Sequence, residues 1–361
     1  VDEAEAAYAV MGGTEPSLGI VFEYPAPPAE ATAEPRRTVR LADPAVAPGK
    51  AHVGFIGSGN YATRVLIPAF RAAGAGLGSV ASAAGVSGLH AARKFGFADT
   101  TTDSARIFDD PSIDTVAITT RHDSHAALVL RALEGGKHVF VEKPLCLTDQ
   151  ELDAIVAART ASGQGRLLTV GFNRRFAPHV VKMKALLAGA DAPKAIVVTV
   201  NAGAIPADHW TQDPAVGGGR IIGEACHFID LVRHLAGAPI VEARRSAMLS
   251  ASGDTVTLQL AFEDGSIGTV HYFANGHRGV AKERVEVFSS GRVLRLDNFR
   301  SLTGHGWKGF RKTRLWNQDK GQRACAAAFV SAVKTGGPAP IPFEEIVEVT
   351  RTTLALAKEQ A

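Results

Sequence analysis

The 361-residue sequence has few cysteines, little excess charge and no long apolar run. Cys146, Cys226 and Cys325 are odd in number and lack CxxC spacing, which argues against a disulfide framework or a structural zinc site. The 39 Lys and Arg residues against 36 Asp and Glu give a net charge of +3, too small to favour nucleic acid or an anionic membrane as a partner. No stretch of about 18 apolar residues occurs, and the amino end, VDEAEAAYAV, is acidic where a signal peptide would be basic. We therefore expect a cytoplasmic protein with a small-molecule partner.

Two kinds of periodicity divide the chain. From Ala51 onward, apolar runs such as HVGFI, LGSVAS, DTVAIT and KHVFVE alternate with helical patterns. This alternation predicts parallel strands with helical crossovers, a doubly wound Rossmann-type α/β domain over residues 49–171. Longer alternating runs follow, among them DTVTLQLAF and SIGTVHYFA, with EDGS and SSGR as turns. They predict an α+β domain with a mainly antiparallel sheet over residues 172–361.

The first strand is followed by a glycine turn, GFIGSGNYA. Gly57, Gly59 and Ala62 have the GxGxxA spacing that brings a backbone close to a pyrophosphate at a helix amino terminus. The spacing alone is a weak signal, and a structural turn or a nucleoside-type ligand is the alternative. In this position it predicts dinucleotide binding, with cofactor contacts from Gly57, Ser58, Gly59, Asn60, Tyr61 and Ala62.

The second strand ends in SVASAAG, with Ser82 where many NAD sites have an acid on the ribose hydroxyls. A hydroxyl does not repel a ribose phosphate as a carboxylate would. Ser82, followed by Ser87, His90, Arg93 and Lys94, therefore favours NADP slightly over NAD. The alternative interpretation is that Arg93 and Lys94 form a solvated helix face.

Another strand ends in KHVFVEKPLC, with Glu142, Lys143 and Pro144 at its tip. In open parallel sheets, ligands collect beyond the carboxyl ends of the strands. A partly desolvated lysine beside a nicotinamide can take part in proton transfer, and the proline can adopt a cis bond. The alternative is a surface ion pair between Glu142 and Lys143.

Five motifs, GFIGSGNYA, TRHDSHA, GKHVFVEKPL, GFNRRFAP and GGGRIIGEACHFIDL, together resemble the glucose-fructose oxidoreductase, inositol dehydrogenase and MocA (Gfo/Idh/MocA) family over about residues 50–360. The resemblance implies a second domain with an open sheet that mediates homo-oligomers, dimers or tetramers. It implies hydride transfer between NAD(P) and a sugar, cyclitol or nucleotide sugar, with Lys143 catalytic. A cofactor-sensing binding protein, or an epimerase or eliminase with transient oxidation, is the alternative.

The resemblance also suggests roles for single residues. Further cofactor contacts are expected from Thr119, Thr120, Arg121, His122, His125, Glu142 and Asn173. The alternative for each histidine is a residue at a helix start whose ring is satisfied by backbone groups. Arg174 and Trp210 are expected to bind substrate, although Trp210 equally suits a loop anchor, and Arg175 is interpreted as a surface charge. His227 is expected to bind substrate or transfer a proton.

Many relatives have Asp four residues before this histidine, where this chain has Gly223. Glu224, on the same helix face as His227, is therefore the candidate catalytic carboxylate. A metal site is not expected, because no further ligand has suitable spacing. The basic segment with Arg311, Lys312 and Arg314 is interpreted as a surface loop or a contact for a substrate phosphate.

The first 48 residues differ from the rest. Residues 25–49 are rich in Pro and Ala, which predicts a linker. The preceding AEAAYAVMGGTEPSLGIVFEYP resembles the carboxyl end of a medium-chain, zinc-type alcohol dehydrogenase, of the kind found fused to this family. We interpret residues 1–48 as the remnant of a fusion or truncation, disordered or draped over a neighbouring surface. An ordinary disordered extension is the alternative.

Overall fold

A computed structural model describes residues 37–42, 51–163, 165–188, 192–250 and 252–358. The chain divides into two units between Arg37 and Thr38. Our remnant hypothesis for residues 1–48 falls mostly outside the described residues. The fold below is that of the second unit.

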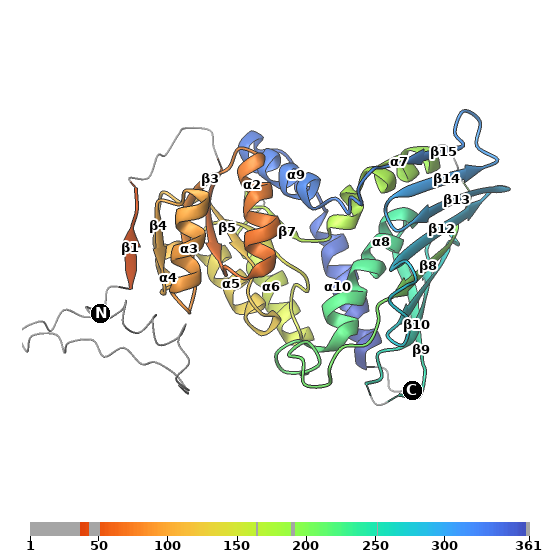
Figure 1. Ribbon diagram of the computed structural model, residues 1–361, viewed down its shortest axis with the longest axis horizontal. Helices are drawn as coiled ribbons and strands as arrows, with labels where there is room; N and C mark the ends of the chain where they lie inside the picture. The colour runs from red at the N-terminus through yellow and green to blue at the C-terminus, as the bar shows by residue number, and fades with distance from the viewer. Residues whose placement is uncertain (1–36, 43–50, 164, 189–191, 251, 359–361) are drawn as a thin grey trace, which may run out of the picture. The chain divides into compact units, whose positions relative to one another are not determined.

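The first sheet has the strand order β1-β4-β3-β2-β5-β6-β7 (Figure 1). Its strands are β1 (Thr38–Arg40), β2 (His52–Ile56), β3 (Gly76–Ala81), β4 (Asp99–Thr101), β5 (Thr115–Ile118), β6 (His138–Val141) and β7 (Leu168–Val170). Every pair from β4 to β7 is parallel. Strands β2 and β5 are buried along their whole length, which explains their continuous apolar sequences. The predicted Rossmann-type sheet is confirmed.

Helices connect these strands. They are η1 (Ala62–Leu66), α2 (Ile67–Ala72), α3 (Val86–Phe95), α4 (Ala105–Asp109), η2 (His122–Ser124), α5 (His125–Glu134) and α6 (Asp149–Ala161). The capping box of α6, in which Thr148 and Glu151 each bond the other's backbone N–H, starts this helix soon after the tip of β6.

Strand β1 lies in the segment that we described as a linker. Thr38–Arg40 pairs antiparallel with Asp99–Thr101, and the Thr38 hydroxyl donates to Oγ1 of Thr101 at 3.0 Å. This pairing covers the exposed hydrogen-bonding groups of the edge strand β4. The linker prediction is therefore wrong for these residues.

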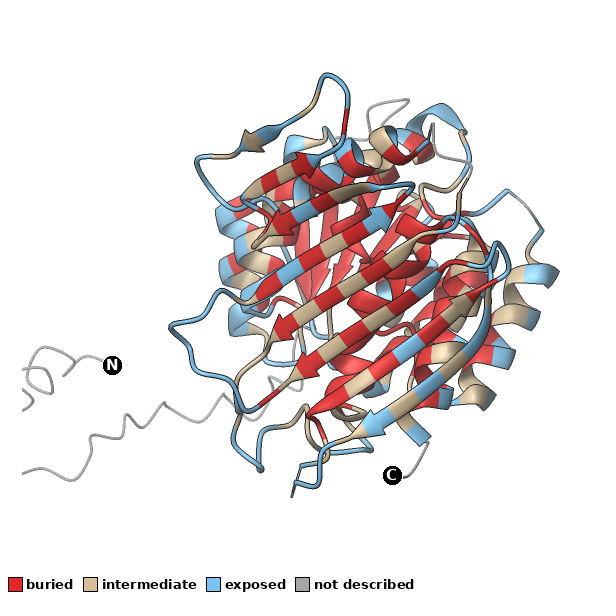
Figure 2. Cartoon of the chain, turned by 90° about the vertical axis from the view of Figure 1, so that its right-hand side faces the viewer, coloured by how far each residue is buried: buried red, intermediate tan, exposed pale blue. Residues whose placement is uncertain are grey.

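The second sheet has the order β15-β14-β13-β12-β8-β11-β10-β9. Its strands are β8 (Ala195–Asn201), β9 (Ile240–Ala247), β10 (Val256–Phe262), β11 (Ile267–Phe273), β12 (Glu283–Ser289), β13 (Arg292–Asp297), β14 (Ser301–His305) and β15 (Lys312–Arg314). Among the described strands, β8 and β11 pair in parallel and the other neighbours are antiparallel. Burial alternates along β10 and β12, and Figure 2 shows the sheet face that no helix covers. The mainly antiparallel open sheet is confirmed.

The remaining helices lie between the sheets or join them. They are η3 (Asn173–Phe176), α7 (Pro178–Leu187), η4 (Ile221–Ala225), α8 (Cys226–Ala236), α9 (Gln322–Thr335) and α10 (Phe343–Lys358). Helix α8 packs on β8 and β11, and α10 packs on α6 and α8. Within the described residues, none of the helices combines the length and apolarity needed to cross a bilayer.

Helix α9 belongs to the core of the first sheet, although we assigned residues 172–361 to the second domain. Phe329 on α9 contacts Phe70 and Phe140, with ring centroids 6.2 and 5.5 Å apart, and α9 lies beside α2 in Figure 1. The chain thus returns to the first sheet near its carboxyl end, so the division at residue 171 does not separate two independent cores.

Candidate cofactor and substrate site

The glycine turn follows β2 and opens the helix η1. Gly57 has φ +102°, and a Cβ added there would lie 2.8 Å from the Thr119 backbone. The Thr119 hydroxyl donates to Gly57 O at 2.9 Å, so the loop after β5 holds the turn in place. A Cβ added at Gly59 meets no atom within 4 Å. The turn is therefore tight on the sheet side and open at Gly59, as a pyrophosphate cradle must be.

A chain of hydroxyls follows the carboxyl end of β3. Ser58 Oγ donates to Ser87 Oγ at 2.9 Å, and Ser82 Oγ lies 2.7 Å from the same oxygen. These hydroxyls lie where a ribose-binding carboxylate would follow the second parallel strand. Of the cations that we considered for this position, Lys94 instead lies over the Phe95 ring, 5.3 Å from its centroid.

Lys143 reaches from the tip of β6 to the helix η4. Its Nζ donates to Gly223 O at 2.6 Å, and the Lys143–Pro144 peptide bond is cis. The lysine joins the end of the parallel sheet to the first turn before α8. This contact makes a simple surface ion pair with Glu142 a poor description of the site.

Glu142 lies half-buried beside Lys143 and forms a side-chain hydrogen bond with Tyr61. Burial raises the pKa of Glu142 to about 7, although Lys143 and the bond from Tyr61 oppose the increase. Burial also raises the pKa of Tyr61, and the Glu142 charge adds to that increase. Glu142 and Tyr61 thus connect the glycine turn to the lysine tip, and both groups keep their protons to a higher pH than usual.

His125 is buried and bonded to backbone groups. Its Nδ1 lies 2.6 Å from Pro144 O, and its Nε2 lies 3.3 Å from Thr120 O. Burial lowers its pKa, so the neutral ring donates from Nδ1 through the shorter of the two contacts. The ring thus holds the lysine-proline tip in place, and these bonds favour a histidine satisfied by backbone groups over the cofactor contact that we predicted.

His122 lies between the loop after β5 and the start of η4. Its Nδ1 is 2.8 Å from Gly217 O, and the Trp210 ring meets it edge-on with centroids 4.8 Å apart. Arg121 lies over the same indole at 5.7 Å. Burial lowers the pKa of His122 to about 4, with a smaller effect from Lys143. Trp210 thus anchors a loop against residues 121–122, one of the two roles that we considered for it.

His227, on the first turn of α8, is buried against Phe172, with ring centroids 6.2 Å apart. Its Nδ1 is enclosed without a hydrogen-bond partner. Burial lowers its pKa well below the ordinary value, and the charges of Arg174 and Lys143 add to the effect. The ring is therefore neutral, and Lys143 lies within electrostatic reach of both His122 and His227.

Glu224, on η4, is held by three neighbouring side chains. Its carboxylate accepts hydrogen bonds from the Tyr272 hydroxyl, from Lys282 Nζ at 2.6 Å and from Arg220 Nη2 at 3.2 Å. Burial would raise its pKa, but Lys282, Tyr272 and Arg220 together lower the pKa to about 2. A carboxylate that stays ionised and fully bonded is unsuited to proton transfer at neutral pH. The contacts therefore argue against the catalytic role that we predicted for Glu224.

Asn173 and Arg174 also have structural partners. Asn173 Nδ2 donates to Lys320 O at 2.6 Å, and Arg174 Nη2 donates to Glu283 Oε1 at 2.7 Å. Lys320 Nζ bonds the same carboxylate oxygen at 3.1 Å. Arg174 thus ties η3 to β12 beside the site, and the direct substrate contact that we expected is not what these bonds favour.

Arg175 is buried and paired with Asp230 and Glu345, so its interpretation as a surface charge is wrong. Sequence reasoning also missed Tyr272, Lys282 and Lys320, which no local motif marks. Their convergence on η3 and η4 depends on the strand order of the second sheet, which we did not predict from the sequence.

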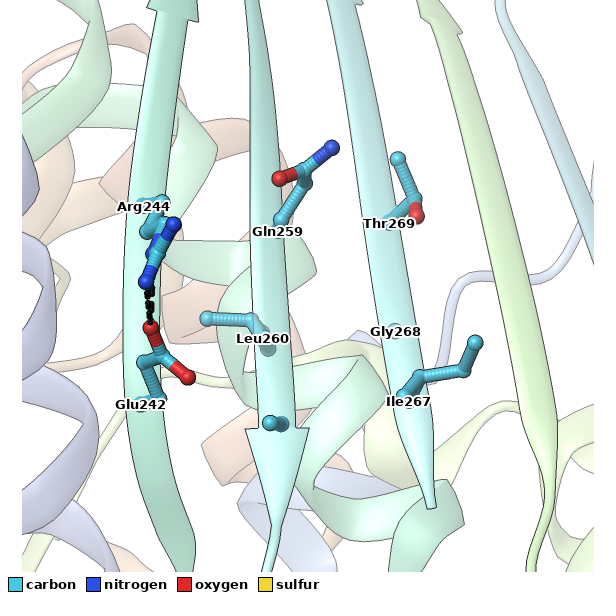
Figure 3. Close-up of a pocket in the computed structure, with 8 residues that line it drawn as sticks. Glu242, Arg244, Gln259, Leu260, Ile267, Gly268 and Thr269 are labelled. Atoms are coloured by element: carbon cyan, nitrogen blue, oxygen red, sulfur yellow. Dashed lines mark hydrogen bonds and ion pairs between the residues drawn. The ribbon is translucent and has the colours of Figure 1, made fainter. Parts of the chain in front are cut away.

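Other candidate regions lie apart from these contacts. A shallow hollow of about 420 Å³ lies on the open face of the second sheet, where Arg244 pairs with Glu242 beside Gln259 and Thr269 (Figure 3). Lys312 and Arg314 bound the edge strand β15. In the part of the chain that the structure describes, no group of three or more His, Cys, Asp or Glu side chains could hold a metal ion.

Curated proteins with similar sequences include several sugar and cyclitol dehydrogenases. "Uncharacterized oxidoreductase YrbE" of Bacillus subtilis is 29% identical over 60% of this chain and 67% of its own length. Myo-inositol 2-dehydrogenase of Thermotoga maritima is 28% identical, over 56% of this chain and 61% of its own. Levoglucosan dehydrogenase of Pseudarthrobacter phenanthrenivorans is 28% identical, over 52% and 56%. The chain thus spans little more than half to two thirds of these relatives.

Solved structures share the fold over most of the chain. A levoglucosan dehydrogenase in complex with NADH and levoglucosan superposes with a TM-score of 0.75, at 24% identity over 85% of this chain and 96% of the other. An oxidoreductase domain protein from Kribbella flavida also gives 0.75, at 22% identity and the same coverage.

Two family models match consecutive parts of the sequence. The model described as "Oxidoreductase family, NAD-binding Rossmann fold" matches residues 51–172, and the one described as "GFO/IDH/MocA C-terminal domain" matches residues 191–295. Both matches follow the two observed sheets, and together they cover most of the chain. The protein belongs to the Gfo/Idh/MocA oxidoreductase family.

Proposed function

We propose that the protein is an NAD(P)-dependent oxidoreductase that transfers hydride between nicotinamide and a hydroxyl-bearing carbon of a sugar, cyclitol or nucleotide sugar. The observation that carries the proposal is the position of Lys143. Its ammonium group lies beyond the carboxyl end of β6, on Gly223 O and within electrostatic reach of the neutral His227. The relatives named myo-inositol 2-dehydrogenase and levoglucosan dehydrogenase support this class of substrate.

The residues of the glycine turn fit a dinucleotide. The open backbone at Gly59 and the amides at the start of η1 would hold the pyrophosphate. The Ser58, Ser87 and Ser82 hydroxyls would face the adenosine ribose. Because these bonds join hydroxyls and not a carboxylate, which would repel a ribose phosphate, we infer a slight preference for NADP. Residues 119–121, Glu142 and Lys143 would line the nicotinamide end.

The chemistry divides between the cofactor and this chain's own side chains. The bound cofactor supplies the hydride acceptor or donor at its nicotinamide ring. In the reduction direction, the Lys143 ammonium group bonds the carbonyl oxygen of the substrate and gives it a proton, directly or through a water. In the oxidation direction, the neutral amine of Lys143 takes that proton from the hydroxyl and becomes the ammonium group again. His227 orients the same oxygen as a neutral imidazole. Because general acid-base groups contribute about 10²–10⁴-fold, Lys143 is expected to account for a large part of the rate.

Lys143→Met tests this assignment. We expect kcat to fall by about 10²–10⁴-fold, because the proton-transfer group is lost, while the affinity for cofactor stays within a few-fold. Turnover is measured by nicotinamide absorbance with a panel of polyols, and affinity by calorimetric titration with NADH and NADPH. Tighter binding of NADH than of NADPH by the wild type would contradict the NADP preference.

Lys137→Met is a matched control at the other end of β6. Among the described residues, Lys137 Nζ donates to the carbonyls of Asp110 and Ile113, away from the tip of β6, so its loss should lower stability and leave kcat nearly unchanged. Near-normal turnover in Lys143→Met would remove that lysine from the mechanism. A wild type that binds cofactor but turns over no polyol would support the cofactor-sensing alternative.

A further inference from the structure

His122 and Gly223 form a matched pair across the site. A Cβ added at Gly223 would lie 2.9 Å from His122 Cε1 and 3.4 Å from its Nδ1. The imidazole thus occupies the space that any side chain at residue 223 would need. Glycine inside a helix costs about 1 kcal/mol relative to alanine, so its presence here has a packing reason. The ring of His122 is that reason.

Two bonds hold the ring on this glycine. His122 Nδ1 faces Gly217 O at 2.8 Å, and the next residue donates its backbone N–H to Val216 O at 3.1 Å. Trp210 closes the other side of the ring edge-on. These neighbours belong to the segment before α8 and not to the glycine turn, so the ring faces the substrate side of the site.

The tautomer of His122 follows from its partner. A carbonyl oxygen only accepts, so Nδ1 carries the hydrogen and, in the neutral ring, Nε2 is an acceptor. Nε2 makes no hydrogen bond within the described residues, yet it is not among their enclosed unpartnered atoms as His227 Nδ1 is. His122 therefore presents an unused acceptor that a ligand can reach.

Lys143 contacts the same glycine from the side of the sheet, through Gly223 O. Gly223 is therefore in contact with Lys143, whose ammonium group holds the reacting oxygen, and lies next to the His122 ring, which offers an acceptor. The Lys143 charge also acts on the His122 ring, so a ligand held by Lys143 has His122 among its neighbours.

We propose that His122 binds substrate, with Nε2 accepting a hydrogen bond from the hydroxyl next to the carbon that is oxidised. The site then selects polyols with two neighbouring hydroxyls, and Gly223 is required because it makes room for the ring. This inference rests on the proposed function. It also reassigns His122, which the sequence had suggested for the cofactor.

The test crosses enzyme variants with substrate analogues. The substrate is a polyol that the wild type oxidises, from a panel of myo-inositol, levoglucosan and glucose, together with its analogue deoxygenated at the neighbouring carbon. His122→Asn keeps a donor for Gly217 O, but its shorter side chain has no acceptor at the position of Nε2, whereas His122→Phe keeps a ring and lacks both groups. We expect the wild type to lose about tenfold in kcat/KM on the deoxy analogue. Both variants should lose about tenfold on the parent polyol and nothing further on the analogue.

Three results would overturn the proposal. If the losses in kcat/KM from mutation and from deoxygenation multiply, a group other than His122 binds that hydroxyl. If only His122→Phe is impaired, the bond to Gly217 matters and the acceptor does not. If either variant weakens NADPH or NADH binding without substrate, the hydroxyl belongs to the cofactor ribose. A wild type that oxidises no polyol would instead refute the proposed function, and this inference with it.

Thermal unfolding tests the packing without any assay of activity. Gly223→Ala should lower the unfolding midpoint in the wild type, because the new methyl group meets the tethered ring. In the His122→Asn background, which lacks Cε1, most of that loss should vanish. An equal loss in both backgrounds would show that the ring is not what requires glycine at residue 223.

Discussion

At the scale of residues, Glu142 and Lys143 are neighbours in sequence with different surroundings. Lys143 extends to Gly223 O, whereas Glu142 turns back to the Tyr61 hydroxyl beside the glycine turn. Burial raises the pKa of Glu142 from its ordinary value of 4.5 to about 7. The native protein thus keeps a proton on this carboxyl in a range where the unfolded chain has released it.

Glu142→Gln should therefore change how stability depends on pH. As pH rises from about 4.5 to 7, ionisation of Glu142 lowers the stability of the wild type, because the native state binds this proton more tightly than the unfolded state. The variant lacks this loss. We expect the free energy of unfolding of Glu142→Gln, relative to wild type, to increase by about 2 kcal/mol between about pH 5 and about pH 8. Urea denaturation at both pH values measures it, and a constant difference would contradict the shift.

Local spacing predicted the residues whose roles depend on local geometry. Gly57 and Gly59 lie in the turn after β2, and Lys143 lies just after the end of β6. The structure thus places all three at the carboxyl edge of the first sheet, as the local sequence predicted. Glu224 and His125 could not be predicted in the same way. Glu224 accepts hydrogen bonds from Lys282 and Tyr272, and His125 bonds Pro144 O. Only the tertiary fold brings these partners within reach.

At the scale of elements, the unexpected features are β1, the π-helical turn η4 and the placement of α9. Apolar periodicity predicts that a helix exists, but not which sheet it covers. Helix α9 (Gln322–Thr335) falls in the range 172–361 that we assigned to the second domain, and that assignment followed only from its place in the sequence. Similarly, the helical pattern through residue 227 gave no sign that Ile221–Ala225 would be π-helical.

Phe329→Ala tests the role of α9. Phe329 is fully buried against Phe70 and Phe140, so its loss leaves a cavity in the core of the first sheet. We expect the free energy of unfolding to fall by about 3–5 kcal/mol. Ser331→Ala, at an exposed position of the same helix, is the control. Equal stabilities of the two variants would show that α9 is dispensable to that core.

At the scale of the whole molecule, the open face of the second sheet carries a row of apolar side chains. Ile267 on β11 is in register with Ala261 on β10 and Ala195 on β8, and Ala195 is in register with Phe288 on β12. Ile267 is 58% exposed and Phe288 is 42% exposed. Exposed apolar rows of this kind favour association, and the expected homo-oligomer would cover this one.

Replacing both Ile267 and Phe288 by Glu should therefore lower the molar mass in solution. Burying two unpaired carboxylates in an apolar interface is unfavourable, so the assembly should dissociate towards monomers. Light scattering after size-exclusion chromatography measures the mass. Thr269→Glu, one row away on the same face, is a control for the added charge. A wild type that is already monomeric would refute the expectation.

The return of α9 to the first sheet has a consequence for how the protein is made. Residues 51–171 leave the ribosome long before Gln322 is translated. During that time the nascent nucleotide-binding half lacks Phe329, which packs on Phe70 and Phe140 in the folded protein. Until α9 (Gln322–Thr335) has been translated, that half cannot complete its core. Expressed alone, it should require chaperones or aggregate.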